Sequence, residues 1–143
     1  VIDSISEEVI EAAVRVYNGK AVINSVNGKE QSMRSIFPIA KKYGALVIGL
    51  TLDEQGIPKS AEERLKIAEK IITTAAEYGI PKEEIIIDCL ALTAFSPLSE
   101  VMETAKAVKM VKDKLGVLTC LGISNVSYGL RNRNSVYLSC CRP

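Results

Sequence analysis

Apolar segments of strand length alternate with amphipathic segments of helix length along this chain. The apolar segments lie near residues 1–3, 20–25, 45–51, 84–90 and 117–123 and are continuous rather than alternating in polarity. Continuous apolar strands are typical of a parallel sheet covered by helices, because parallel neighbours need a crossover segment between them. The sequence therefore predicts an α/β fold built from parallel strands with crossover helices.

Local signals indicate where the predicted helices begin. Two segments carry a serine followed three residues later by a glutamate, the spacing of a capping box that closes the first turn of a helix. The two pairs are Ser4 with Glu7 and Ser60 with Glu63, and we expect a helix to begin at each serine. Pro38 interrupts a third helical pattern, where its ring removes a backbone donor and predicts a kink or a new helix start.

Length and charge narrow the class of protein. A chain of 143 residues with 48% hydrophobic composition can bury one core, so we expect at most one domain. The formal net charge of +1 favours neither nucleic acid nor an anionic membrane as a partner. The apolar segments are far shorter than the roughly 20 residues of a membrane helix, and no signal peptide is visible, so we expect a cytoplasmic protein.

The residue types restrict the possible chemistry. Histidine is absent, which excludes Ser-His and Cys-His catalysis and leaves acid–base work to Asp, Glu, Lys, Tyr or water. The four cysteines form no CxxC pair, so we expect no metal site. They are Cys89, Cys120, Cys140 and Cys141. Glycine-rich phosphate loops are also absent.

Four polar residues lie at or just after the carboxyl ends of the predicted strands: Asp3, Asn24, Asp88 and Asn125. Since the carboxyl ends of parallel strands share one edge, we expect these side chains to meet at one face. Carboxylates accept paired N–H donors, and amides both donate and accept, so the set suits a planar, nitrogen-rich ligand. An Asp or Asn after a strand also commonly caps a helix or forms a turn, and that alternative stays open for each residue.

Four longer motifs stand out: INSVNGKE at 23–30, LTLDEQGIP at 50–58, IDCL at 87–90 and GISNVSYGL at 122–130. Together they resemble the pterin-binding domain of cobalamin-dependent methionine synthases. The related methyltetrahydrofolate:corrinoid methyltransferases are similar across the same stretches, and dihydropteroate synthases resemble the chain more distantly. The resemblance runs from about Asp3 to Leu130, so we expect residues 1–130 to form a partial pterin-binding domain.

The resemblance implies a partial (β/α)8 barrel that covers about strands 2 to 6. It also implies binding of methyltetrahydrofolate, whose N5-methyl group would pass to a corrinoid (cobalamin) carried by a partner domain or protein. Asp3, Asn24 and Asp88 match positions that hold the pterin ring, and Asn125 matches the asparagine that approaches N5. In this reading Asn125 is the catalytic residue, and the domain itself binds no metal.

The pattern of the family changes after Leu130. Arg131 stands where the family has proline, Arg133 still aligns with a family arginine near the pterin, and residues 131–143 form an atypical tail. By this comparison the first strand and the last two strands of a barrel are missing. Exposed strand edges would then favour a homo-oligomer or another protein partner.

Two other functions remain as alternatives. The chain could be a non-catalytic barrel fragment or assembly module that keeps the family sequence without a finished site. Dihydropteroate synthesis has less support, because no loop is rich in the basic residues that pyrophosphate chemistry requires.

Overall fold

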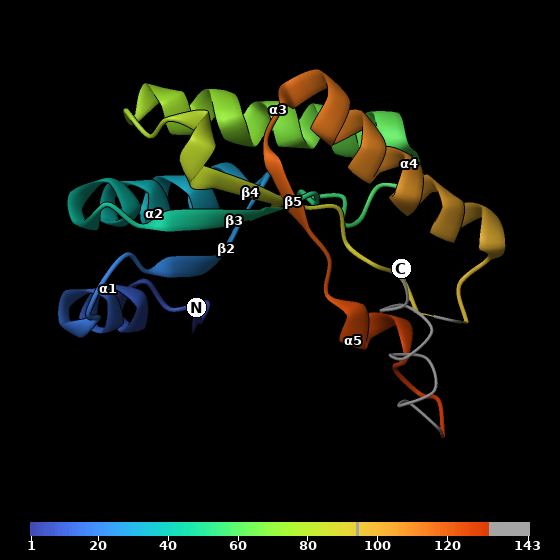
Figure 1. Cartoon of the computed structure of the whole chain (residues 1–143), viewed down its shortest axis with the longest axis horizontal. Helices are drawn as coiled ribbons and strands as arrows, with labels where there is room; N and C mark the ends of the chain where they lie inside the picture. The colour runs from blue at the N-terminus through green and yellow to red at the C-terminus, as the bar shows by residue number, and fades with distance from the viewer. Residues whose placement is uncertain (94, 132–143) are drawn as a thin grey trace.

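Five parallel strands form a single sheet in the computed structural model, which describes residues 1–93 and 95–131 (Figure 1). The strand order is β1-β2-β3-β4-β5, and each pair of neighbours is parallel. The strands are β1 (Ile2–Asp3), β2 (Val22–Asn27), β3 (Leu46–Leu50), β4 (Ile85–Asp88) and β5 (Leu118–Cys120). The predicted α/β fold with parallel strands is therefore confirmed.

Four helices form the crossovers between successive strands. They are α1 (Glu7–Val16), α2 (Glu30–Tyr43), α3 (Ala61–Glu77) and α4 (Leu98–Leu115); a 3₁₀ turn, η1 (Lys82–Glu84), precedes β4, and a short helix, α5 (Ile123–Val126), follows β5. Helices α3 and α4 pack side by side, and α1 lies at the other end of the sheet beside α2 (Figure 1). This succession of βα units is consistent with part of a (β/α)8 barrel. None of the helices in the described ranges has both the length and the apolar character needed to cross a membrane.

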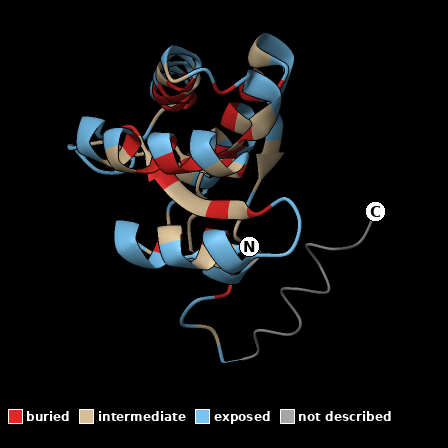
Figure 2. Ribbon diagram, turned by 90° about the vertical axis from the view of Figure 1, so that its left-hand side faces the viewer, coloured by how far each residue is buried: buried red, intermediate tan, exposed pale blue. Residues whose placement is uncertain are grey.

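The two faces of the sheet differ in burial. One face presents Ile23, Val47 and Ile85, which are paired in register and fully buried. Residues one step further along the strands point to the opposite face, and there Ile48 and Ile86 are half-buried. The helices therefore cover one face, whereas the other stays partly open (Figure 2).

The covered face packs directly against α2 and α3. Phe37 from α2 and Ile71 from α3 are both fully buried, and the Phe37 ring lies 5.7 Å from the Tyr78 ring between centroids. Gly49 in β3 allows α3 to come close, because a Cβ atom there would lie 3.0 Å from Cγ2 of Ile71. The core is thus a layer of aliphatic side chains between the sheet and its helices.

The first helix begins later than its capping-box spacing predicts. Ser6 is the N-cap of α1, and its Oγ accepts a hydrogen bond from the Val9 backbone N–H at 3.4 Å. The hydroxyl of Ser4 instead accepts from the Ser6 N–H at 3.1 Å. The prediction of a start at Ser4 was wrong because a second serine two residues on takes the capping role.

Pro38 does not interrupt α2, which runs unbroken from Glu30 to Tyr43. The missing backbone donor leaves the carbonyl of Arg34 without its usual partner. Both Pro38 and Arg34 are exposed, so water can satisfy that carbonyl. Of the two predicted outcomes, the new helix start was therefore wrong, and the kink stays a prediction.

The last apolar run forms a shorter strand than the sequence predicts. β5 covers Leu118–Cys120, whereas the prediction covered 117–123, and the end of the run already belongs to α5. Among the described strands, β5 pairs with β4 on one side alone, and Leu118 is 64% exposed. An apolar run at a sheet edge therefore need not be buried along its length.

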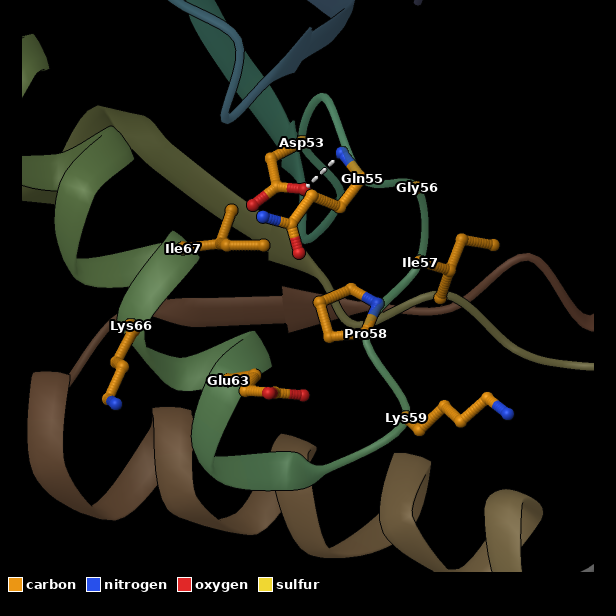
Figure 3. Close-up of a pocket in the computed structure, with 9 residues that line it drawn as sticks. All are labelled: Asp53, Gln55, Gly56, Ile57, Pro58, Lys59, Glu63, Lys66 and Ile67. Atoms are coloured by element: carbon orange, nitrogen blue, oxygen red, sulfur yellow. Dashed lines mark hydrogen bonds between the residues drawn. The ribbon is translucent and has the colours of Figure 1, made fainter.

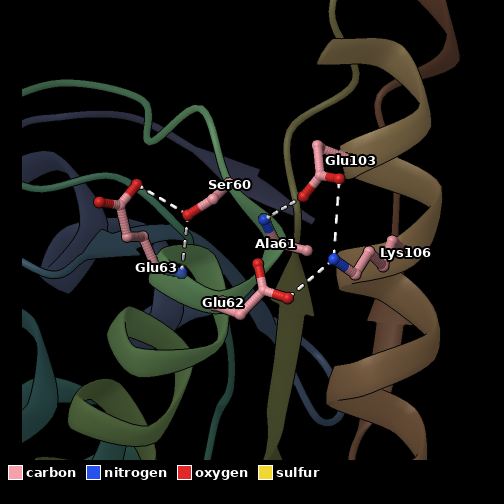
Figure 4. Close-up of polar contacts among 6 residues, drawn as sticks. All are labelled: Ser60, Ala61, Glu62, Glu63, Glu103 and Lys106. Atoms are coloured by element: carbon pink, nitrogen blue, oxygen red, sulfur yellow. Dashed lines mark hydrogen bonds and ion pairs between the residues drawn. The ribbon is translucent and has the colours of Figure 1, made fainter. Parts of the chain in front are cut away.

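Ser60 caps α3 as the sequence predicts. Its Oγ accepts from the Glu63 backbone N–H at 3.3 Å and donates to the Glu63 carboxylate at 2.9 Å (Figure 4). We expect Ser60→Ala to lower the free energy of unfolding by about 1 kcal/mol, because that N–H loses its acceptor. Urea unfolding followed by circular dichroism measures the change. Ser99→Ala, at an exposed serine inside α4, is the matched control, and equal losses in both variants would contradict the capping role.

Candidate functional site

Three of the predicted site residues share the open face of the sheet. Asp3 on β1 pairs in register with Asn24 on β2, so their side chains leave the sheet next to each other on the same side. Asp88 ends β4 and pairs with Leu50 on β3 and with Cys120 on β5. Through the register of β2 with β3 and of β3 with β4, Asn24 is level with Ile86, and Asp88 lies two residues further along β4, so its side chain leaves the same face nearer the carboxyl edge of the sheet. The fold thus brings Asp3, Asn24 and Asp88 to one face, away from the covering helices.

Asp88 is the most constrained of the three. It is half-buried, and its Oδ1 accepts a hydrogen bond from the Leu90 backbone N–H at 2.7 Å. Burial raises the pKa of the Asp88 carboxyl, and the Leu90 N–H opposes this effect by stabilising the charge. Leu90 itself has a φ of +62°, in the left-handed region that side chains with a Cβ rarely adopt. A tight turn therefore fixes one carboxylate oxygen and leaves the other for a ligand.

Asp3 and Asn24 keep their hydrogen-bonding capacity available. Neither side chain makes a hydrogen bond within the described residues, whereas the Asn24 backbone carbonyl accepts from the Ser4 N–H at 3.2 Å. The Asn24–Ser25 peptide bond is cis, and the pairing register with β3 shifts between Asn24 and Val26. Asn24 is half-buried and Asp3 is exposed, and polar groups without protein partners can accept from and donate to a bound ligand.

Asn125 lies further from the sheet than the sequence predicts. It belongs to α5, five residues after β5 ends at Cys120, and its side chain is exposed. Its amide nitrogen lies against Gly122, where an added Cβ would be 3.1 Å away. Arg133, the remaining predicted pterin contact, lies outside the described residues. The structure thus groups Asp3, Asn24 and Asp88 and leaves Asn125 on a separate segment.

Gly28 joins two of the loops at the carboxyl edge of the sheet. Its N–H donates to the Leu52 carbonyl at 2.8 Å, and its own carbonyl accepts from Nζ of Lys70 at 2.6 Å. A Cβ at Gly28 would lie 2.7 Å from Cγ2 of Ile67, so a larger residue would push this loop off α3. The lack of a side chain therefore lets the β2–α2 loop pack onto the β3–α3 loop.

Two cavities open along the carboxyl edge of the sheet. One, of about 630 Å³, lies between the β1 and β2 exits and the first turns of α2, and Ser4 and Ser25 line it directly after Asp3 and Asn24. The other, of about 530 Å³, is formed by the β3–α3 loop and the start of α3, with Pro58 and Ile67 among its walls (Figure 3). Asp88 lines neither of these two cavities, although its partner in register, Leu50, lines the first of them.

Sequence reasoning missed Arg64 and the position of Cys120. Arg64 is fully buried in α3, and its Nη1 donates to the Cys89 carbonyl at 2.8 Å, one residue after Asp88. A sequence signal existed, because Arg64 falls on the apolar stripe of α3 beside Ala61 and Ala68.

Cys120 lies next to Asp88 on the neighbouring strand β5, and burial together with the Asp88 charge raises the pKa of the Cys120 thiol to about 11. The pairing of Asp88 with Cys120 depends on the register between β4 and β5, which the sequence alone does not give.

No group of three or more His, Cys, Asp or Glu side chains within residues 1–93 and 95–131 has the arrangement of a metal site. The polar groups at the carboxyl edge are carboxylates and amides with free donors and acceptors. This arrangement suits recognition of an organic ring through hydrogen bonds.

Comparison with known proteins now identifies the family. A family model described as "Pterin binding enzyme" matches residues 1–139. The methionine synthase of Mycobacterium leprae (strain TN) is 34% identical over 157 aligned residues, which cover 99% of this chain and 13% of the relative. The methionine synthase of Mycobacterium tuberculosis (strain ATCC 25618 / H37Rv) is 32% identical over the same shares, so the chain spans 13% of the length of these curated relatives. The predicted resemblance is thereby confirmed, and this chain belongs to the family of pterin-binding enzymes.

Proposed function

We propose that this chain binds 5-methyltetrahydrofolate at the open face of its sheet and acts as a methyltransferase domain. The N5-methyl group would pass to a corrinoid (cobalamin) cofactor on a partner domain or protein, as in methionine synthesis. Family membership and the similarity to two methionine synthases support this proposal. The observation that carries it is the polar set of Asp3, Asn24 and Asp88, which share one otherwise largely aliphatic face.

Each residue of this set has a role that follows from its chemistry. The Asp88 carboxylate accepts N–H donors from the edge of the pterin ring, and those donors favour the charged form that burial disfavours. Asn24 both donates to and accepts from a ring edge, and Asp3 accepts from a neighbouring donor. Arg133 would contact the same ring and stays a prediction, because it lies outside the described residues.

Asn125 would assist departure of the methyl group. A tertiary amine is a poor leaving group, so the charge that develops at N5 needs a hydrogen bond. The Asn125 amide can donate that bond but cannot act as an acid, so water must supply any proton. The corrinoid, when bound to its own domain, supplies the nucleophile in this family, and the pterin site orients the methyl group toward it.

The proposed partners follow from the same reasoning. A corrinoid-bearing domain must reach the carboxyl edge of the sheet, where α5 leaves Asn125 exposed. Self-association through the open edges of β1 and β5 stays a prediction, as does the boundary after Leu130. A cytoplasmic location also stays a prediction.

A substitution at Asn125 tests the methyl-transfer step separately from binding. We expect Asn125→Ala to slow methyl transfer from methyltetrahydrofolate to a reduced corrinoid by about tenfold, which is the loss of one hydrogen bond to a developing charge. Folate affinity should change much less, because Asn125 lies on α5 and apart from the ring-binding set. Single-turnover absorbance of the corrinoid and a binding titration separate the two quantities.

Ser99→Ala, on the exposed surface of α4, is the control in the same assays. Equal losses of affinity and rate in Asn125→Ala would contradict a role limited to the transfer step. Folate binding without any methyl transfer by the unaltered chain would instead favour the alternative of a non-catalytic fragment.

A further inference from the structure

Arg64 is the largest fully buried side chain among the described residues, and no carboxylate within them forms an ion pair with it. Its Nε donates to the Pro58 carbonyl at 2.9 Å, and its Nη1 donates to the Cys89 carbonyl at 2.8 Å and to Oγ1 of Thr104 at 2.6 Å. A buried charge costs stability unless it is fully hydrogen-bonded, and an apolar side chain of similar size often serves the core as well. Stability alone therefore gives a weak reason for an arginine at this position.

The contacts of Arg64 converge on the turn that follows Asp88. Besides the Cys89 carbonyl, Nη1 approaches the Leu90 carbonyl at 3.4 Å. Thr104 from α4 donates to the same Leu90 carbonyl at 3.4 Å, so α3 and α4 hold the turn together. Leu90 keeps an unfavourable left-handed conformation there, and such a conformation persists where surrounding contacts enforce it.

The geometry points to Arg64 as a positioning residue that holds the Cys89–Leu90 turn, so that the Leu90 N–H orients the Asp88 carboxylate toward the ligand. The chain of contacts is continuous: Arg64 Nη1 binds the Cys89 and Leu90 carbonyls, and the Leu90 N–H binds Asp88 Oδ1 at 2.7 Å. The relevance of Arg64 to folate binding rests on the proposed function, whereas the effect of Arg64 on Asp88 does not.

Few titratable groups surround Asp88. Cys89 adjoins it in the chain and Cys120 adjoins it from β5; burial raises the pKa of Cys89 to about 12 and that of Cys120 to about 11. Both thiols are thus neutral at acidic and neutral pH. Burial lowers the pKa of Arg64 on α3, but an arginine pKa starts so far above this range that the guanidinium stays positively charged within it. A titration near Asp88 in this range therefore reports Asp88.

Carbon-13 NMR of the free protein tests the inference without any ligand. The Leu90 N–H stabilises the ionised carboxylate, so loosening the turn in Arg64→Met should raise the Asp88 pKa. The matched control is Lys106→Met, which breaks another α3–α4 link, the ion pair at 2.7 Å between Nζ of Lys106 on α4 and the Glu62 carboxylate on α3 (Figure 4). The control should leave the Asp88 titration unchanged. An unchanged titration in folded Arg64→Met would overturn the inference.

Thr104→Val provides a second variant if Arg64→Met does not fold. It keeps the side-chain volume and removes the hydroxyl that contacts both Arg64 and the Leu90 carbonyl. We expect a shift of the Asp88 titration in the same direction and of smaller size. No shift in Thr104→Val would then count against the inference.

A binding titration with methyltetrahydrofolate extends the test to the ligand. Arg64→Met should weaken binding by about tenfold, the effect of one misplaced hydrogen bond to a charged group. In an Asp88→Asn background the same substitution should cost almost nothing, because the residue through which Arg64 acts has changed. An equal loss in both backgrounds would overturn the inference. If the unaltered chain binds no folate, the proposed function fails while the NMR titration still decides the role of Arg64.

Discussion

Replacing Asp88 by asparagine is expected to weaken the binding of methyltetrahydrofolate by about a thousandfold, which corresponds to two charge-assisted hydrogen bonds. Asparagine keeps the shape of the side chain and can still accept from the Leu90 N–H. With its carbonyl held by that N–H, asparagine presents an NH₂ group to the ligand, so a pterin N–H donor would face another donor. Isothermal titration calorimetry measures the change, and an unchanged affinity would exclude Asp88 from the site.

The same substitution should stabilise the fold at neutral pH. Burial raises the pKa of Asp88 in the folded state, so the stability contribution of this group is fully present below its unfolded pKa and is lost as the pH rises through its folded pKa. Asparagine does not ionise and avoids that loss. Urea unfolding should therefore give Asp88→Asn a larger free energy of unfolding than the unaltered protein at pH 7. Near pH 3, which lies below the ordinary Asp pKa of about 3.9, the two free energies should be close. A difference of equal size at both pH values would contradict the burial effect.

Phe37→Ala is expected to destabilise the domain by about 3–5 kcal/mol, the usual result of removing a large buried ring. Phe37 is fully buried between α2 and the sheet and packs against the Tyr78 ring. Domains of this size are stable by about 5–15 kcal/mol, so the variant should lie close to the limit of folding. Urea unfolding followed by circular dichroism measures the loss.

Phe95 provides the matched control for this prediction. It is the other phenylalanine of the chain and is 70% exposed, so Phe95→Ala removes the same atoms from a surface position. We expect a change below about 1 kcal/mol, as for most surface substitutions. Similar losses in the two variants would show that the core does not depend on Phe37 packing.

The fold was largely predictable because its signals are local. The continuous apolar strands predicted parallel pairing, and Ser60 and Glu63 marked the start of α3 where the structure has it. The errors arose where two local signals competed, as with the neighbouring serines before α1, or where exposure decided the outcome. Pro38 is tolerated because it lies on the exposed side of α2, and a single sequence window does not reveal which side that is.

The candidate site was predictable in part. Parallel strands place their ends at one edge, and that rule was enough to bring Asp3, Asn24 and Asp88 to one face. It failed to locate Asn125, because the apolar run before it leaves the sheet at Cys120 and enters α5. The burial of Arg64 can be read from its place on the apolar stripe of α3, but its contacts with the Cys89 and Leu90 carbonyls cannot, because backbone carbonyls distant in sequence carry no residue-type signature.

The sequential strand order has a consequence for how this chain assembles. Each strand pairs with the strand that directly precedes it, so every pairing spans a single crossover helix. Closing a short segment costs less chain entropy than joining distant ones, and local connections favour fast folding. Each βα unit can therefore dock on the edge left by the previous unit while the chain is still being synthesised. If the units docked in this way, the growing sheet would present one unpaired edge at a time to the next unit.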